Sequence, residues 1–189
     1  MRISLFAVLL AGACAPRPAE PLAALPEFSM TAVLPEGTAA FGRKDLLGKV
    51  WVADFVFTRC AGPCPLLSER LAALGNALPP AVGLLTVAVD SEGDTPARLR
   101  SYAKRYGAEP GRWVFLRGTP EETYHLLYAG FRLPLSIDPA ASEERRATHS
   151  ARFVLLDRSG AIRGYYDGLS ESDNAVLARD AQRLLEVGS

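Results

Sequence analysis

Two cysteines, Cys60 and Cys64, are separated by three residues directly after an apolar stretch of the chain. This spacing allows the two sulfur atoms to meet, either in a disulfide bond or around one metal ion. Thiolates are soft ligands that suit Cu(I) or Zn(II) and are poor partners for Mg²⁺ or Ca²⁺. A permanent disulfide is the alternative, but so short a loop removes little chain entropy and would stabilise the fold weakly. The pair therefore predicts redox or soft-metal chemistry.

The elements on either side of the cysteines are a predicted strand, 50–57, and a predicted helix, 65–78. The strand is an almost unbroken apolar run, VWVADFVF, typical of a strand covered on both faces. Leucines recur through the helix at the spacing of one helical face. Because Pro65 disfavours helical angles at Cys64, we expect the helix to begin at Pro65 with Cys64 as its cap. Both thiols would then face the positive end of the helix dipole, which favours thiolate.

A third candidate ligand is His149, one of only two histidines in the chain. It follows a polar stretch and precedes a strand predicted at 152–157, which should pair beside the cysteine loop. One imidazole added to two thiolates completes a three-coordinate Cu(I) site, or, with a fourth ligand, a Cu(II) or Zn(II) site. His125 lies within a predicted helix and reads as a surface or packing residue.

Three carboxylates lie in or near these elements, and their positions require an explanation. Asp54 lies in the middle of the apolar strand, where a charge is costly. Asp90 ends the next buried strand, and either orients a ligand and tunes the thiols from outside the ligand set or makes strand-end hydrogen bonds. Asp94, or else Thr95, is expected to cap the following helix.

The remaining pattern alternates strands with helices, which predicts an α/β sheet. Its order matches a thioredoxin-like fold, with a central mixed sheet flanked by helices and an N-terminal hairpin that includes Phe28–Val33. The other predicted elements are strands at 84–89, 113–116 and 161–166, and helices at 95–106, from Thr119, and at 170–187.

The N-terminus has the pattern of an export signal. Arg2, a short apolar run and the small residues before Cys14 predict a signal peptide over 1–13. Cys14 then resembles the acceptor of a lipoprotein, although simple cleavage that leaves a free cysteine is the alternative. The Pro- and Ala-rich residues 14–26 predict an extended tether to the membrane, and 27–189 the domain itself. Export also permits disulfides to persist.

Composition argues against a nucleic-acid partner. The chain of 189 residues carries 21 basic and 21 acidic side chains, giving a formal net charge of zero, and no long basic run.

Three segments together resemble the Sco/SenC family over essentially the whole domain. They are the run from Phe55 to Pro65, the run from Val89 to Pro96 (VDSEGDTP), and His149-Ser150. The resemblance implies a thioredoxin-like copper chaperone that binds copper through Cys60, Cys64 and His149. It also implies delivery to the binuclear copper centre in the copper-bearing subunit of cytochrome c oxidase, or to another copper acceptor. We expect a thiol reductant as a second partner, and a lipid-anchored location in a bacterial envelope, facing the periplasm or exterior.

Two other functions compete with this interpretation. The first is a thiol–disulfide oxidoreductase, because Asp54-Phe55 resembles the buried Asp-Phe of thioredoxins, whose acid relays protons. Thioredoxins have two residues between their cysteines and a cis-proline before the strand that faces them. Here three residues separate the cysteines and Thr148–Arg152 contains no proline, which disfavours this function. The second is a peroxidase of related fold, but Thr58 and Arg59 directly precede the cysteine, which is the wrong placement. Zinc stays an alternative to copper.

Overall fold

Two parallel strands, β4 (Val50–Val56) and β5 (Val82–Ala88), form the centre of an eight-stranded mixed sheet. The computed structural model describes residues 20–138, 140–145 and 147–186. All seven residues of both strands are buried, as their apolar sequences predict. In order across the sheet, the strands are β1 (Ala23–Ala24), β10 (Ala161–Asp167), β9 (Arg152–Leu156), β4, β5, β6 (Trp113–Arg117), β2 (Ser29–Val33) and β3 (Thr38–Gly42).

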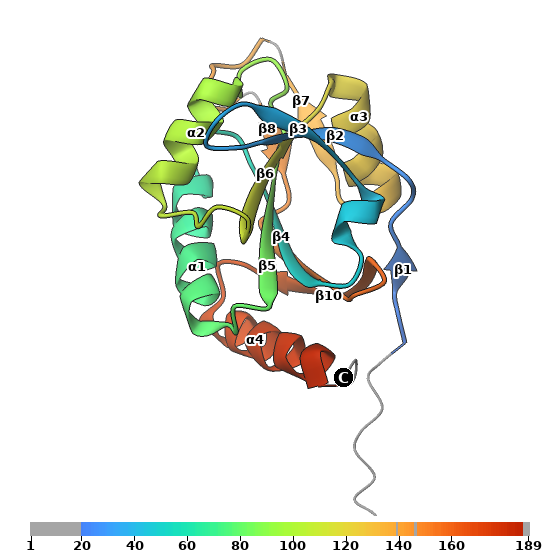
Figure 1. The fold of residues 1–189 in the computed structure, drawn as a ribbon. Helices are drawn as coiled ribbons and strands as arrows, with labels where there is room; N and C mark the ends of the chain where they lie inside the picture. The colour runs from blue at the N-terminus through green and yellow to red at the C-terminus, as the bar shows by residue number, and fades with distance from the viewer. Residues whose placement is uncertain (1–19, 139, 146, 187–189) are drawn as a thin grey trace, which may run out of the picture.

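Helices flank the central strands on both sides, which confirms the predicted thioredoxin-like α/β architecture. In Figure 1, α1 (Cys64–Ala77) and α2 (Pro96–Arg105) lie to the left of the central strands, and α3 (Pro120–His125) lies to the right. The C-terminal α4 (Glu171–Glu186) packs on β4, β10 and α1. Short helical turns at Arg43–Leu46 and Leu126–Gly130 complete the set. The predicted elements are present with bounds shifted by one or two residues.

Helix α1 begins one residue earlier than predicted, at Cys64. Pro63 has helical angles, with φ −75° and ψ −19°, and its carbonyl oxygen accepts the Leu67 N–H over 2.9 Å. The first turn therefore closes on Pro63, and Pro65 lies where a missing N–H costs nothing. The predicted leucine stripe is buried, at Leu67, Leu71, Leu74 and Leu78.

The cap of α2 is Thr95, whose hydroxyl accepts the Arg98 N–H. The assignment of this role to Asp94 was wrong. Asp94 is fully buried, and its Oδ1 accepts hydrogen bonds from the backbone N–H (2.8 Å) and hydroxyl (2.6 Å) of Thr58. It thus connects the start of α2 to the cysteine loop instead of capping the helix.

The predicted N-terminal hairpin is present as β2 paired with β3. The tether, in contrast, ends earlier than the predicted residue 26: β1 pairs with β10, and Leu25 is buried. The apolar side chain of Leu25 explains this, because it extends the core at the sheet edge. The signal peptide and Cys14 lie outside the described residues. Within the described ranges, no helix combines the length and apolar character needed to span a bilayer.

A second, two-stranded sheet carries His149. It pairs β7 (Leu135–Ile137) with β8 (Ala147–His149), with Leu135 opposite His149. The end of the polar stretch before the strand at 152 forms one strand of this hairpin, an element that the sequence pattern did not predict. The hairpin lies at the upper end of the main sheet in Figure 1, the end at which α1 begins. The topology therefore brings His149 to the cysteine loop.

Candidate metal and redox site

The cysteine loop is held in place at both ends. Before Cys60, the Thr58 backbone and hydroxyl bind Asp94, and the Cys60 N–H donates to the Phe57 carbonyl over 3.1 Å. At the other end, Cys64 is fully buried in the first turn of α1. Cys60 is partly exposed. Both are free thiols in this structure, so the described site is in its reduced form.

The two thiols differ sharply in acidity. A hydrogen bond from the Cys64 thiol, helped by the Gly62 N–H at 3.3 Å, lowers the pKa of Cys60 to about 6. The same hydrogen bond, together with burial, raises the pKa of Cys64 above its ordinary value. We had expected the helix dipole to favour thiolate at both. The structure corrects this, because two adjacent sulfurs share one proton and only Cys60 is the thiolate at neutral pH.

His149 faces Cys64 directly. Its Nε2 lies 3.3 Å from Cys64 Sγ, and its Nδ1 lies 3.0 Å from the Ser150 carbonyl oxygen. A carbonyl oxygen only accepts, so Nδ1 carries the hydrogen and the Nε2 lone pair points at the sulfur. Burial lowers the pKa of His149, which favours this neutral form. The Phe57 ring meets the imidazole edge-on at 6.0 Å between centroids and restricts its orientation.

The three predicted ligands therefore form a connected series, with Cys64 contacting both Cys60 and His149. In this arrangement, no group of three or more described His, Cys, Asp or Glu side chains is gathered closely enough to hold a metal ion. Cys64 is the common member, since its single thiol proton has two acceptors, the Cys60 sulfur and His149 Nε2. The donor chemistry, two soft sulfurs and one imidazole nitrogen, fits a soft metal ion that replaces this proton.

Asp54 lies beneath the site in β4 and is buried. Its Oδ1 accepts the Thr86 hydroxyl hydrogen over 2.5 Å, and the Thr86 oxygen accepts from Trp113 Nε1 over 2.7 Å. Its other oxygen, Oδ2, has no hydrogen-bond partner among the described residues. Burial raises the pKa of Asp54 to about 7, against the opposing effect of Thr86. A carboxyl that titrates near neutrality and has one free oxygen is chemically able to exchange a proton.

Asp90 contacts the cysteine loop through a residue that the sequence did not single out as part of the site. Its Oδ2 pairs with Arg59 Nη2 at 2.7 Å, and its Oδ1 accepts the Gly93 N–H over 3.0 Å. The second nitrogen of the guanidinium pairs with Glu143 at 2.5 Å. This orientation counts against the peroxidase hypothesis, because Arg59 is turned toward acids. The sequence places Arg59 directly before Cys60, and only the fold reveals its acidic partners.

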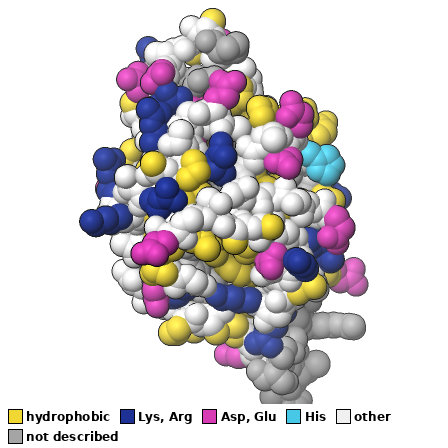
Figure 2. Space-filling view, turned by 45° about the horizontal axis from the view of Figure 1, so that its top comes forward, with side chains coloured by type: hydrophobic (Ala, Val, Ile, Leu, Met, Phe, Trp, Pro, Cys, Tyr) yellow, Lys and Arg dark blue, Asp and Glu magenta, His cyan; other side chains and the backbone are white. Residues whose placement is uncertain are grey.

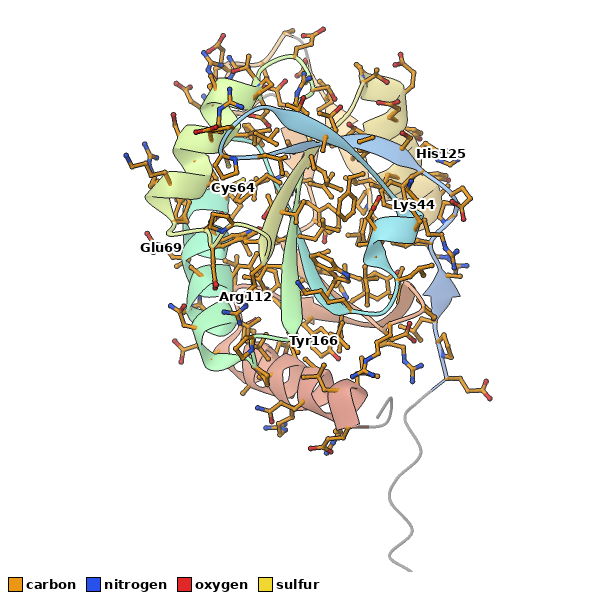
Figure 3. The ribbon with its side chains drawn as sticks, viewed as in Figure 1. Lys44, Cys64, Glu69, Arg112, His125 and Tyr166 are labelled. Carbon is orange, nitrogen blue, oxygen red and sulfur yellow. The ribbon has the colours of Figure 1, made fainter. Side chains whose placement is uncertain are left out.

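His125 lies on α3, exposed and on the side of the sheet opposite Cys64, as Figure 3 shows. Its prediction as a helix-surface residue is confirmed. On the face drawn in Figure 2, acidic and basic side chains are interspersed, consistent with the net charge of zero.

A mixed sheet with a Cys-x3-Cys loop at the start of a helix, faced by a histidine, defines a thioredoxin-like protein whose thiols share their site with an imidazole. The family model described as SCO1/SenC matches residues 23–186, and the chain belongs to this family.

Relatives of this family agree with the fold. The chain is 28% identical over 143 residues to the SCO1 protein homolog of Bacillus subtilis (strain 168), covering 74% of this chain and 72% of that protein. A crystal structure of a SCO1/SenC family lipoprotein from Bacillus anthracis superposes with a TM-score of 0.76 at 29% identity, covering 88% and 98% of the two chains. Bradyrhizobium japonicum ScoI, solved with copper bound, gives a TM-score of 0.66 at 26% identity, covering 86% and 99%.

Proposed function

We propose that this protein is an exported copper chaperone that holds one copper ion through Cys60, Cys64 and His149. Its destination is the binuclear copper centre of cytochrome c oxidase. The observation that carries the proposal is the contact of 3.3 Å between Cys64 Sγ and His149 Nε2, with Nδ1 tied to a carbonyl oxygen. The histidine thus presents a lone pair to a thiol, and not a hydrogen. Membership of the SCO1/SenC family and the copper-bound relative support the choice of copper over zinc.

The thiol acidities define how copper is taken up. Cys60 is a thiolate at neutral pH and partly exposed, so it is the first ligand that an incoming ion meets. Cys64 is buried and protonated, and loses its proton only when the cation arrives. His149 needs no deprotonation, because burial lowers its pKa. Since the described side chains are not gathered closely enough to hold a metal ion, binding through all three requires these ligands to approach one another.

Copper binding and thiol oxidation exclude one another in this site. Only the dithiol binds Cu(I), and the predicted export places the protein where disulfides persist. A disulfide between Cys60 and Cys64 would remove two of the three ligands. A thiol reductant is therefore a required partner. Asp54 is the residue that we assign to proton exchange during this cycle, from its burial, its free Oδ2 and its pKa of about 7.

A thiol–disulfide oxidoreductase is the second candidate, and the same acidities favour it. A partly exposed thiolate beside a buried thiol is the arrangement of an attacking and a resolving cysteine. Asp54 would serve that chemistry equally well. The two functions differ in the role of His149. Copper binding uses His149 as a ligand, whereas disulfide exchange does not require it.

The test titrates Cu(I) into the reduced protein against a competing chelator. We expect one copper per chain, and His149→Ala should weaken binding by at least about tenfold, the lower limit typical even for residues outside the ligand set. Cys60→Ser should weaken it further. His125→Ala is the matched control, since it removes the other imidazole, on α3. Unchanged affinity in His149→Ala, with disulfide exchange intact, would favour the oxidoreductase.

A further inference from the structure

Arg59 bridges two parts of the molecule that are far apart in the sequence. It is the residue before Cys60, and its side chain is 16% exposed. One guanidinium nitrogen pairs with Asp90 Oδ2 at 2.7 Å, and the other with Glu143 Oε2 at 2.5 Å. Both are charge-assisted contacts of hydrogen-bond length, which are stronger than neutral ones. A single side chain therefore connects the cysteine loop to the turn after β5 and to the segment that leads into β8.

The Asp90 end of this bridge is fixed. Asp90 is 2% exposed and also accepts the Gly93 N–H. Gly93 has no room for a side chain, because a Cβ there would overlap Arg59 Nη2 and Asp90 Oδ2. The turn is thus packed tightly around the guanidinium. Removing one partner of a buried ion pair is strongly destabilising, which favours keeping Arg59 in this place.

The Glu143 end of this bridge lies at the surface. The Glu143 side chain is 70% exposed, six residues before His149. Strand β7 packs on the core through Leu135 and also borders a hollow. This hollow of about 500 Å³ separates the strand from the turn after β5; its lining residues are Val89, Asp90, Ser91, Glu92, Pro120, Tyr124, Leu135, Ser136 and Ile137. The ion pair to Glu143 therefore adds a charged connection to the packing of Leu135 and Ala147 on the core.

We propose that Arg59 is a positioning residue that sets the separation between Cys60 and His149 by tying the cysteine loop to the β7–β8 hairpin through Glu143. Cys64 contacts both Cys60 and His149, and these last two lie on the two parts that Arg59 joins. The part of this inference that concerns copper rests on the proposed function. The part that concerns the hairpin does not, and is measured without metal.

The first experiment uses the reduced, copper-free protein. Glu143→Gln removes one charge and leaves the Arg59–Asp90 pair intact, so the fold is preserved. We expect hydrogen–deuterium exchange of the amides in β8 to rise about two- to fivefold, the range for loss of one exposed ion pair. Glu144→Gln is the matched control, since it makes the same change at the adjacent exposed residue. Equal rates in the Glu143 and Glu144 variants would overturn the proposal.

The second experiment asks whether the bridge acts on the copper ligands. Arg59→Gln and Glu143→Gln should weaken Cu(I) binding and alter the imidazole nitrogen coupling in the EPR spectrum of the Cu(II) form. Arg59→Lys keeps the charge and should restore part of both. Thr95→Ala, which destabilises α2 without touching the bridge, should leave the spectrum unchanged. If His149→Ala leaves copper binding intact, the proposed ligand set is wrong. Hydrogen–deuterium exchange in the copper-free Glu143→Gln protein still tests the role of Arg59 in that case.

Discussion

The Cys64 thiol donates its hydrogen to the Cys60 sulfur, and this one bond separates the acidities of the two residues. It lowers the pKa of Cys60 to about 6 and raises that of Cys64. The partly exposed member of the pair, Cys60, is thus the reactive one, and the buried Cys64, which also faces His149, is protected. Uptake of copper and attack on a disulfide would both begin at Cys60.

The first prediction follows from this bond. Alkylation of reduced protein should modify Cys60 with a midpoint near pH 6, because only the thiolate reacts. Cys64→Ala removes the donor, so the midpoint should move up toward the ordinary thiol value of about 9. Mass spectrometry of the alkylated peptides measures both. In the Cys60→Ala protein, Cys64 should stay unmodified at pH 7. A midpoint near pH 9 in the wild type would show that the two thiols do not share a proton.

The second prediction concerns Asp54 and the pH dependence of stability. Its folded-state pKa of about 7 lies above its ordinary value of 3.8. The folded protein therefore holds this proton more tightly, and the associated stability is complete below about pH 4 and lost as pH rises through 7. Asp54→Asn should remove this dependence. The unfolding free energy of the wild type, minus that of Asp54→Asn, should then fall by up to about 4 kcal/mol from pH 4 to pH 8.

Chemical denaturation at several pH values measures this difference, with exposed Glu36→Gln as the matched control.

The proposed role of Asp54 in proton exchange is tested by the kinetics of the cysteine pair. Asp54→Asn should slow reduction and oxidation of the cysteine pair while changing Cu(I) affinity little. Unaltered thiol–disulfide kinetics from pH 6 to 9 would leave Asp54 as a structural residue that binds Thr86.

Much of the site could be predicted because its parts have local signatures. The apolar run, the cysteine spacing and the leucine stripe each occupy one segment, so Cys60, Cys64 and the central strands follow from the sequence. His149 needed the family resemblance, since an exposed loop histidine is common. The structure shows why it approaches the cysteines: it lies on β8, which pairs with β7 outside the main sheet.

The parts that could not be predicted depend on contacts between distant segments. Asp94 carries the pattern of a helix cap, and only the fold places Thr58 against it. The unequal thiol acidities arise from one shared hydrogen, which the dipole argument does not include. The role of Arg59 could not be predicted, because its acidic partners at 90 and 143 are far away in the sequence.

The third prediction separates the two residues at the start of α2. Asp94→Ala strands the Thr58 N–H and removes a hydroxyl contact, so we expect it to cost about 2 kcal/mol of unfolding free energy. Thr95→Ala removes the cap and should cost about 1 kcal/mol. Only the first should also change the reactivity of Cys60, because Asp94 holds the cysteine loop. Equal effects on Cys60 alkylation would show that Asp94 acts through α2.

The fourth prediction is the reduction potential of the cysteine pair. A pair that cycles between copper-binding dithiol and disulfide should have a potential above about −300 mV, since structural disulfides lie below that value. Equilibration with defined thiol buffers, followed by trapping of free thiols, measures it. A lower potential would support a permanent disulfide, and copper binding by the oxidised protein would then be expected to fail.

The last prediction concerns Cys14, which lies outside the described residues. We expect it to carry lipid and to anchor the protein at the outer face of a bacterial membrane. Its position directly after Ala11-Gly12-Ala13 motivates this, as does the related lipoprotein of Bacillus anthracis. Since the sheet begins at Ala23, the segment from Cys14 to Leu22 remains as the tether. If fully extended, such a tether would span about 30 Å, at about 3.3 Å per residue, which would allow the proposed copper site to meet a membrane-bound acceptor.

Mass spectrometry of the mature N-terminus tests whether Cys14 carries lipid. A chain that starts at Cys14 with a diacylglycerol mass, recovered in the membrane fraction, is the expected result. Cys14→Ala should move the protein to the soluble periplasmic fraction without changing its Cu(I) affinity, because the cysteine loop is far along the chain at 60–64. An unmodified wild-type chain that starts at Cys14, recovered in the soluble fraction, would instead indicate simple cleavage and a freely diffusing carrier. Delivery would then depend on protein concentration in the periplasm, and lengthening the tether should have no effect on it.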